Sequence, residues 1–140
     1  MRRGVTLPEL LIVVVIVGFA LAVAIPPFQR ALDRIAVDDT VDRYAALHET
    51  TRQLAIVRSS LARIEIDTAR RTAALSVETR GRWDTVDTRP LGEAGIATGQ
   101  NTVTFSPFGI GWGLSNTTII ARRGAVAETV TVSRTGRLKR

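Results

Sequence analysis

The 140-residue sequence contains no cysteine and a single histidine, His48. Without cysteine the chain has no disulfide and no thiolate metal site, so a folded domain must be held together by core packing. One histidine does not supply the ligands of an ordinary zinc site, and Asp84 with Asp87 offers too few oxygens for calcium. Nucleophile-elbow, zinc-protease, phosphate-loop and dinucleotide-binding motifs are also missing. The sequence therefore predicts a non-enzymatic protein without a cofactor or metal ion.

A long uncharged run lies near the N-terminus. Charged residues are absent from Leu10 to Gln29, and the 20 residues of this run would span about 30 Å as a helix, which is enough to cross a bilayer. Arg2 and Arg3 precede the run and predict a cytoplasmic N-terminus, with the remaining chain on the outer side of the membrane.

A single carboxylate, Glu9, lies at the start of the apolar run. At the centre of a bilayer it would cost roughly 2.5–3.5 kcal/mol, so a plain membrane anchor gains nothing from it. Thr6 and Glu9 have the T-x-x-E spacing of a capping box, in which Thr6 caps the helix and Glu9 reaches back to it. An ordinary secretory signal cleaved after Ala24 is the alternative; it explains the apolar run but not Glu9.

The segment GVTLPELLIVVVIVG, residues 4–18, follows the two arginines and resembles the N-terminal signature of type IV pilins and type II secretion pseudopilins. The resemblance implies that a prepilin peptidase cuts after Gly4 and methylates the new amine of Val5. It also implies that Thr6 and Glu9 serve recognition and assembly, with Glu9 pairing with the methylated amine of a neighbouring subunit inside a filament. The alternative is that Glu9 only caps its own helix.

The helical region is predicted to have two parts. Pro26 and Pro27 end the apolar run, where they favour a kink or a melted turn over a complete break. Beyond them an amphipathic helix follows, in which His48 is expected to be a surface or packing residue. Its apolar side chains recur at steps of three, four or seven and are predicted to pack on a sheet: Val37, Val41, Tyr44, Leu47, Leu54, Val57 and Leu61.

After residue 60 the pattern changes to short alternating segments. Trp83 in this region is expected to be a core or cover residue. The predicted strands are Ala62–Asp67, Ala74–Thr79, Thr102–Ser106, Thr117–Arg122 and Glu128–Ser133. The sequence predicts an α+β protein with four segments: a leader at 1–4, a transmembrane or filament-core helix at 5–27, an amphipathic helix at 28–60 and a periplasmic β head at 61–140.

The C-terminal half of the head resembles the GspH/FimT group of minor pseudopilins and pilins. The similar stretches are NTVTFSPFGIGWGLSNTTIIARR and ETVTVSRTGRLKR. The positions that fall on the group's pattern are Phe105, Pro107, Gly109, Gly113, Gly136 and Arg137. The resemblance implies a long N-terminal helix packed on a small antiparallel head of two sheets.

The end of the chain is basic and carries Arg134, Arg137, Lys139 and Arg140. One interpretation is a solubilising terminus. Another is a patch that contacts DNA phosphates or an acidic partner, although no aromatic residue interrupts the tail to stack on bases. A third is binding to an anionic membrane surface.

These features give two leading hypotheses for function. The first is a minor pseudopilin of a type II secretion system, a structural subunit at or near the tip of a periplasmic pseudopilus that drives protein export. The second is a FimT-like minor type IV pilin whose basic C-terminus binds DNA for uptake. A plain single-span periplasmic protein is a third.

The expected partners are other pilin-like subunits, the prepilin peptidase, an inner-membrane assembly platform and membrane lipid, with DNA for the second hypothesis. The expected location is the bacterial inner membrane, crossed once, with the head in the periplasm.

Overall fold

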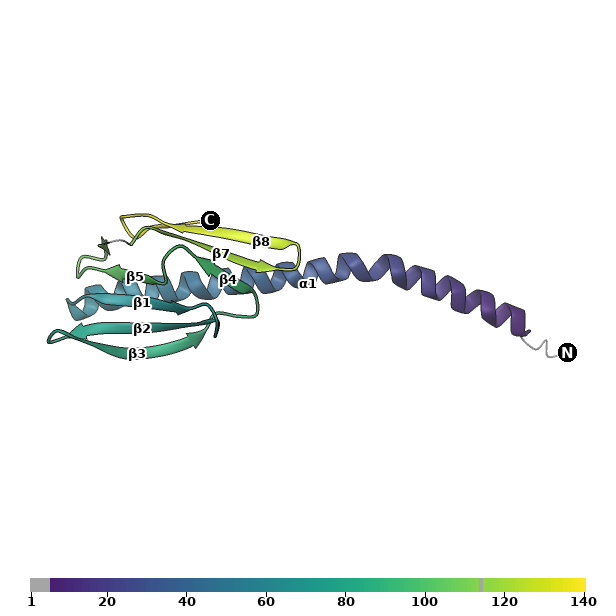
Figure 1. Ribbon diagram of the computed structural model, residues 1–140, viewed down its shortest axis with the longest axis horizontal. Helices are drawn as coiled ribbons and strands as arrows, with labels where there is room; N and C mark the ends of the chain where they lie inside the picture. Colours follow the sequence, from purple (N-terminus) through teal and green to yellow (C-terminus); the bar gives the residue numbers. More distant parts are fainter. Residues whose placement is uncertain (1–5, 114) are drawn as a thin grey trace. The chain divides into compact units, whose positions relative to one another are not determined.

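The computed structural model describes residues 6–113 and 115–140, and the chain forms two compact units, Met1–Leu32 and Asp33–Arg140. The predicted cleavage site at Gly4 and Val5 lies outside the described residues. One helix, α1 (Leu7–Arg58), supplies the first unit and the helical part of the second. Figure 1 shows α1 together with the strands that follow it along the chain.

In the first unit, α1 is apolar and exposed. It is long and apolar enough to cross a membrane, and none of the residues in its most apolar stretch is buried. Helical structure continues through Pro26 and Pro27. The predicted melted turn is therefore not formed, and the helix is not broken at this point; a kink stays a prediction.

In the second unit, antiparallel strands follow α1. They form one sheet in the order β3-β2-β1-β5-β6 and another in the order β4-β7-β8-β9. Their bounds are β1 (Ala62–Asp67), β2 (Thr72–Thr79), β3 (Arg82–Pro90), β4 (Gly95–Thr98), β5 (Thr102–Phe105), β6 (Gly111–Trp112), β7 (Thr117–Arg123), β8 (Val126–Val132) and β9 (Leu138–Lys139). The expected α+β fold of a long helix with two antiparallel sheets is confirmed.

The core of the head lies between α1 and the two sheets. One cluster joins Tyr44 and Leu47 to inward residues of the first sheet such as Ile64 and Phe105, and another joins Val37 to β7 and β8. The residues of α1 that are buried are Val37, Thr40, Val41, Tyr44, Leu47, His48, Thr51 and Ala55. Their spacing of three and four residues keeps them on one side of the helix.

The structure places two residues of this stripe, Val57 and His48, in opposite surroundings. Val57 was expected in the core, but it is 79% exposed. It follows the buried Ala55 by two positions, which is about 200° around a helix of 3.6 residues per turn. His48 is buried and 3% exposed, so it is a packing residue rather than a surface one.

The five predicted strands are present, and four shorter or more polar ones were not predicted. The nine-residue β3 carries charged side chains at Arg82, Asp84, Asp87 and Arg89 and is exposed along nearly its whole length. It is held by pairing with β2 rather than by burial of its own side chains. Trp83 on β3 is 37% exposed, and the guanidinium of Arg63 lies 4.4 Å from its ring centroid, so Trp83 is a cover residue.

Candidate functional site

The start of α1 is capped by its own carboxylate. The backbone N–H of Thr6 donates to Glu9 Oε2 at 3.5 Å, and the Thr6 carbonyl accepts from the amides of Glu9 at 3.1 Å and Leu10 at 3.2 Å. A donor–acceptor distance of 3.5 Å is at the outer limit for a hydrogen bond. Glu9 is exposed, so its carboxylate is able to exchange this contact for a stronger donor.

The apolar face that follows Glu9 is extensive. Val14, Val15 and Phe19 are 68%, 70% and 74% exposed, and their neighbours from Leu10 to Phe28 are exposed as well. Contiguous apolar surface of this size marks a contact with lipid or with other proteins. The first unit is therefore suited to contact lipid or other helices.

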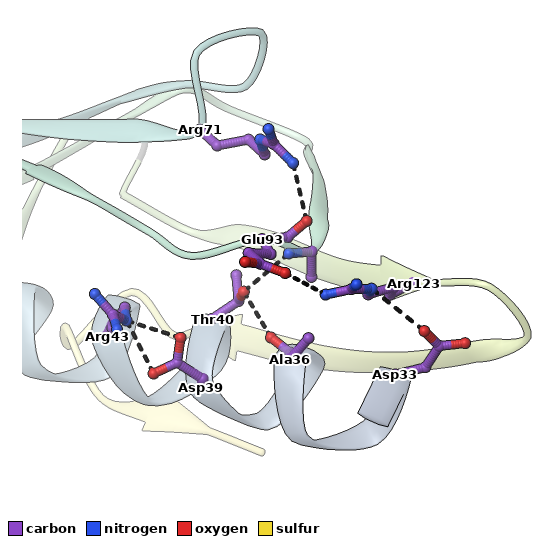
Figure 2. Close-up of polar contacts among 9 residues, drawn as sticks. Asp33, Ala36, Asp39, Thr40, Arg43, Arg71, Glu93 and Arg123 are labelled. Carbon is purple, nitrogen blue, oxygen red and sulfur yellow. Dashed lines mark hydrogen bonds and ion pairs between the residues drawn. The ribbon is translucent and has the colours of Figure 1, made fainter. Parts of the chain in front are cut away.

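A polar clamp in the second unit fastens the start of its helical part to the strands, and Figure 2 shows its contacts. Arg123 on β7 lies between two carboxylates. Its Nε is 3.3 Å from Asp33 Oδ1 on α1, and its Nη1 is 2.5 Å from Glu93 Oε2 in the loop before β4. The Glu93 carbonyl accepts from Arg71 Nη1 at 2.9 Å, which ties the same loop to the turn before β2.

Thr40 forms the buried part of this clamp. Its hydroxyl donates to the Ala36 carbonyl at 2.8 Å and accepts from the Ala94 amide at 3.3 Å. Gly92 has φ of +115°, and a Cβ placed there would lie 2.5 Å from Thr40 Oγ1. Helix and loop thus approach so closely that only glycine fits at this position.

The four basic residues of the predicted tail site lie in different surroundings. Arg140 forms an ion pair with Asp42 on α1, and its Nε lies 3.8 Å from Glu128 Oε1. The hydrogen bond to Asp42 raises the pKa of Arg140 above its usual value. Arg137 and Lys139 lie instead at a cleft beside α1, and Arg134 is exposed outside the lining of that cleft.

This cleft has a volume of about 690 Å³ and is formed by α1 and the segment from Ser133 to Lys139. Arg52 of α1 contributes a third cation, which the sequence did not single out. Its Nε donates to the Gly109 carbonyl at 2.9 Å, and its Nη1 lies 3.7 Å from Glu49. The turn that carries Arg137 is fixed by a bond from the Ser133 amide to the Arg137 carbonyl at 2.8 Å. The arrangement can contact an anionic group.

His48 lines the same cleft but acts as part of the core. Its ring centroid is 4.9 Å from that of Phe105, in an edge-to-face arrangement. Burial lowers the pKa of His48 to about 4; Glu49 opposes this shift weakly and Arg52 adds to it. The ring is therefore neutral at neutral pH.

Metal binding finds no support in the described residues, because residues 6–113 and 115–140 contain no group of three or more potential ligands. Asp84 and Asp87 lie on β3, where Asp87 Oδ2 accepts from Arg89 Nε at 2.6 Å.

Residues 1–25 match the family described as the prokaryotic N-terminal methylation motif. The type IV minor pilin FimU of Pseudomonas aeruginosa (strain PAO1) has a similar structure, with a TM-score of 0.59 and 14% identity over 81% of this chain and 91% of that one. The minor pseudopilin EpsH from the type II secretion system of Vibrio cholerae has a TM-score of 0.60 and 13% identity over 74% of this chain and 94% of that one. No curated protein sequence matches the chain significantly. At such identities the structural similarity shows a shared fold.

Proposed function

We propose that this chain is a minor pseudopilin of a type II secretion system, within the type IV pilin-like group. The methylation motif at residues 1–25 and the fold shared with a minor pilin and a minor pseudopilin support the proposal. In this role it is a structural subunit at or near the tip of a periplasmic pseudopilus that helps drive protein export. It crosses the inner membrane once, with its N-terminus in the cytoplasm and its head in the periplasm. Its partners are other pilin-like subunits, the prepilin peptidase, the assembly platform and membrane lipid.

The observation that carries the assembly role is Glu9 at the head of an exposed apolar helix. When such helices pack side by side, Glu9 becomes buried, and a buried carboxylate without a partner is strongly destabilising. The methylated amine of Val5 in a neighbouring subunit supplies the compensating charge. This amine arises when the prepilin peptidase cuts after Gly4. The pairing sets the register between two subunits.

Ion pairs in and beside the tail weaken the case for DNA uptake. Arg140 is compensated by Asp42 and Glu128. Glu49 lies 3.7 Å from Arg52 in the cleft and reduces the positive charge there. The second candidate, a minor type IV pilin that binds DNA, is favoured by the remaining cations of the cleft, Arg137 and Lys139.

Two substitutions of Glu9 separate assembly from capping. A capping box accepts glutamine as well as glutamate, so Glu9→Gln keeps the helix cap but removes the charge. We expect both Glu9→Gln and Glu9→Ala to insert into the membrane as well as wild type and to enter the filament poorly. Membrane fractionation measures insertion, and chemical crosslinking in cells followed by immunoblotting for complexes with other pilin-like subunits measures incorporation. If Glu9→Gln assembles normally while Glu9→Ala does not, Glu9 acts only as a helix cap and the proposed pairing is wrong.

The two candidate functions are separated in the native host. A strain that lacks this chain should lose secretion of exported proteins into the medium and keep its frequency of natural transformation. Complementation with the wild-type chain should restore secretion. Intact secretion with reduced transformation would support the minor type IV pilin instead.

A further inference from the structure

The five-stranded sheet of the head has a second face, which turns away from α1. Antiparallel partners share a face, so the buried pairs of Ile64 with Leu75 and Val103 define the side toward the helix. The alternate residues define the outer face. One row of this outer face runs across all five strands and consists of Thr85, Ser76, Arg63, Thr104 and Trp112.

Both tryptophans of the chain belong to this face. Trp112 on β6 is 59% exposed, and Trp83 on β3, two residues before Thr85, is 37% exposed. Their strands are the two edges of the sheet, four strand intervals apart, or about 19 Å. Trp112 is the more unusual of the two, because tryptophan is highly buried on average.

The surface between the two rings is lined by polar side chains. Its hydroxyls come from Thr85, Thr88, Thr102 and Thr104; Ser76 beneath them is buried, with its Oγ 3.3 Å from Thr85 Oγ1. A polar groove of about 480 Å³ continues across β1, β2 and β3; its lining includes Glu65, Asp67, Thr72, Thr85, Thr88 and Asn101.

Arg63 organises the centre of the face. Its guanidinium lies 4.4 Å from the Trp83 ring centroid, and its Nη2 is 3.4 Å from Glu65 Oε2. These contacts hold the indole in place and direct the guanidinium along the sheet. Within the described residues, Arg63 Nε is buried without a hydrogen-bond partner.

The chemistry of the face selects among partners. The face and its groove carry two cations, Arg63 and Arg70, against the carboxylates of Glu65, Asp67 and Glu78. Arg70 Nε lies 3.8 Å from Asp67 Oδ2, so no excess positive charge favours nucleic acid or anionic lipid.

Among the paired strand residues of the face, Ala74 and Pro90 are the aliphatic ones, and Val86 at the bulge of β3 is 53% exposed. These side chains are too few and too small to form the broad apolar centre of a protein interface. A neutral ligand with many hydroxyl groups and flat C–H surfaces matches what remains.

We propose that the outer face of this sheet binds a neutral oligosaccharide chain. One sugar ring would stack on Trp112, and another would contact the part of the Trp83 indole that Arg63 leaves exposed, because the C–H groups of a pyranose carry partial positive charge and the face of an indole is negative. Threonine hydroxyls, Arg63 and Glu65 would exchange hydrogen bonds with the sugar hydroxyls between the two rings. This binding is independent of the filament role proposed above.

Tryptophan fluorescence of the full chain, kept in a detergent without sugar groups, tests the proposal directly, because both tryptophans report from the proposed site. The probes are chitotetraose and cellotetraose, two neutral β-linked tetrasaccharides. We expect a saturable change with at least one of them, at an affinity of roughly 1 mM or better, and protection of the indoles from acrylamide quenching. The absence of both effects with both sugars would overturn the proposal.

Variants locate the site. Trp112→Ala should weaken binding at least about tenfold, measured by calorimetry so that the loss of a fluorophore does not matter. Phe108→Ala is the matched control, because Phe108 is an exposed aromatic residue, 84% exposed, in the turn before β6 and outside the face. Equal affinity of the Trp112→Ala chain and wild type would contradict the proposal. Should Trp112→Ala fail to fold, the quenching experiment on the wild-type chain decides alone.

Discussion

Arg140 is joined to Asp42 of α1 by an ion pair, so the C-terminal residue of a basic tail is held against the helix. Glu128 on β8 adds a second carboxylate, 3.8 Å from Arg140 Nε. The tail therefore offers Arg134, Arg137 and Lys139 to an anionic partner rather than all four basic residues. This pairing bears on the choice between protein export and DNA uptake.

We predict that the head has little affinity for DNA near physiological salt. A head of residues 29–140 retains the buried clusters of the second unit, and it can be compared with a variant in which Arg134, Arg137 and Lys139 are alanine. Each phosphate contact contributes about 0.9 to the slope of log affinity against log salt, so both heads should bind weakly at low salt and differ by a slope of at most about three. Fluorescence anisotropy with a labelled duplex measures the slope.

The matched control for this experiment replaces Arg58, Arg80 and Arg82, which are exposed arginines elsewhere on the head. It removes the same number of charges without touching the tail. Strong binding at physiological salt that only the tail variant abolishes would contradict the export assignment.

A second prediction concerns the close approach of Gly92 and Thr40. Gly92→Ala should lower the free energy of unfolding of the head by about 2–4 kcal/mol, because a Cβ at φ +115° is strained and would displace the Thr40 hydroxyl. Gly81→Ala is the control, since Gly81 has φ of +77° but nothing within 4 Å of its Cβ position; we expect a loss of about 1 kcal/mol. Urea denaturation followed by circular dichroism measures both. Equal losses would show that strain alone, and not the contact with Thr40, limits this position.

A third prediction concerns pH. The pKa of His48 is lowered to about 4 in the folded head, from 6.5 when exposed. Between these values the unfolded chain binds more protons, so the folded head loses stability as the pH falls from 6.5 to 4, by about 3 kcal/mol in total. Above pH 6.5 this contribution is constant.

His48→Phe should remove this part of the pH dependence, because phenylalanine has a similar shape and does not titrate. Urea denaturation at pH 7 and pH 4.5 gives the comparison. A wild-type head whose loss of stability over this range equals that of the variant would contradict burial of a neutral His48.

The sequence predicted the parts of the fold that depend on local periodicity. The alternation in Ala62–Asp67 gave β1 with its bounds, and the apolar spacing gave the helix stripe. Thr40 and Thr51 escaped that pattern because they are polar, yet both are buried: their hydroxyls donate to the carbonyls of Ala36 at 2.8 Å and Leu47 at 2.7 Å. A buried threonine whose hydroxyl bonds to a carbonyl of its own helix is polar, so the pattern of apolar residues does not reveal its burial.

Features that depend on contacts distant in sequence were not predicted. The strand β3 has few apolar residues and owes its conformation to pairing with β2. The clamp joins Asp33 to Arg123, and the basic cleft joins Arg52 to Arg137; neither pair is close in the sequence. The charge composition of the tail does not distinguish its four basic residues. In the tertiary structure Arg140 pairs with Asp42, whereas Arg137 lies at the cleft.

The most direct test of the filament-subunit assignment is the mass of the N-terminal peptide of the chain purified from host membranes. We predict a chain that lacks residues 1–4 and begins with N-methylated Val5, because the methylation motif covers residues 1–25 and Glu9 follows the proposed cut at Gly4. A chain that keeps Met1, or one that begins at Ile25 after cleavage by an ordinary signal peptidase, would contradict the account.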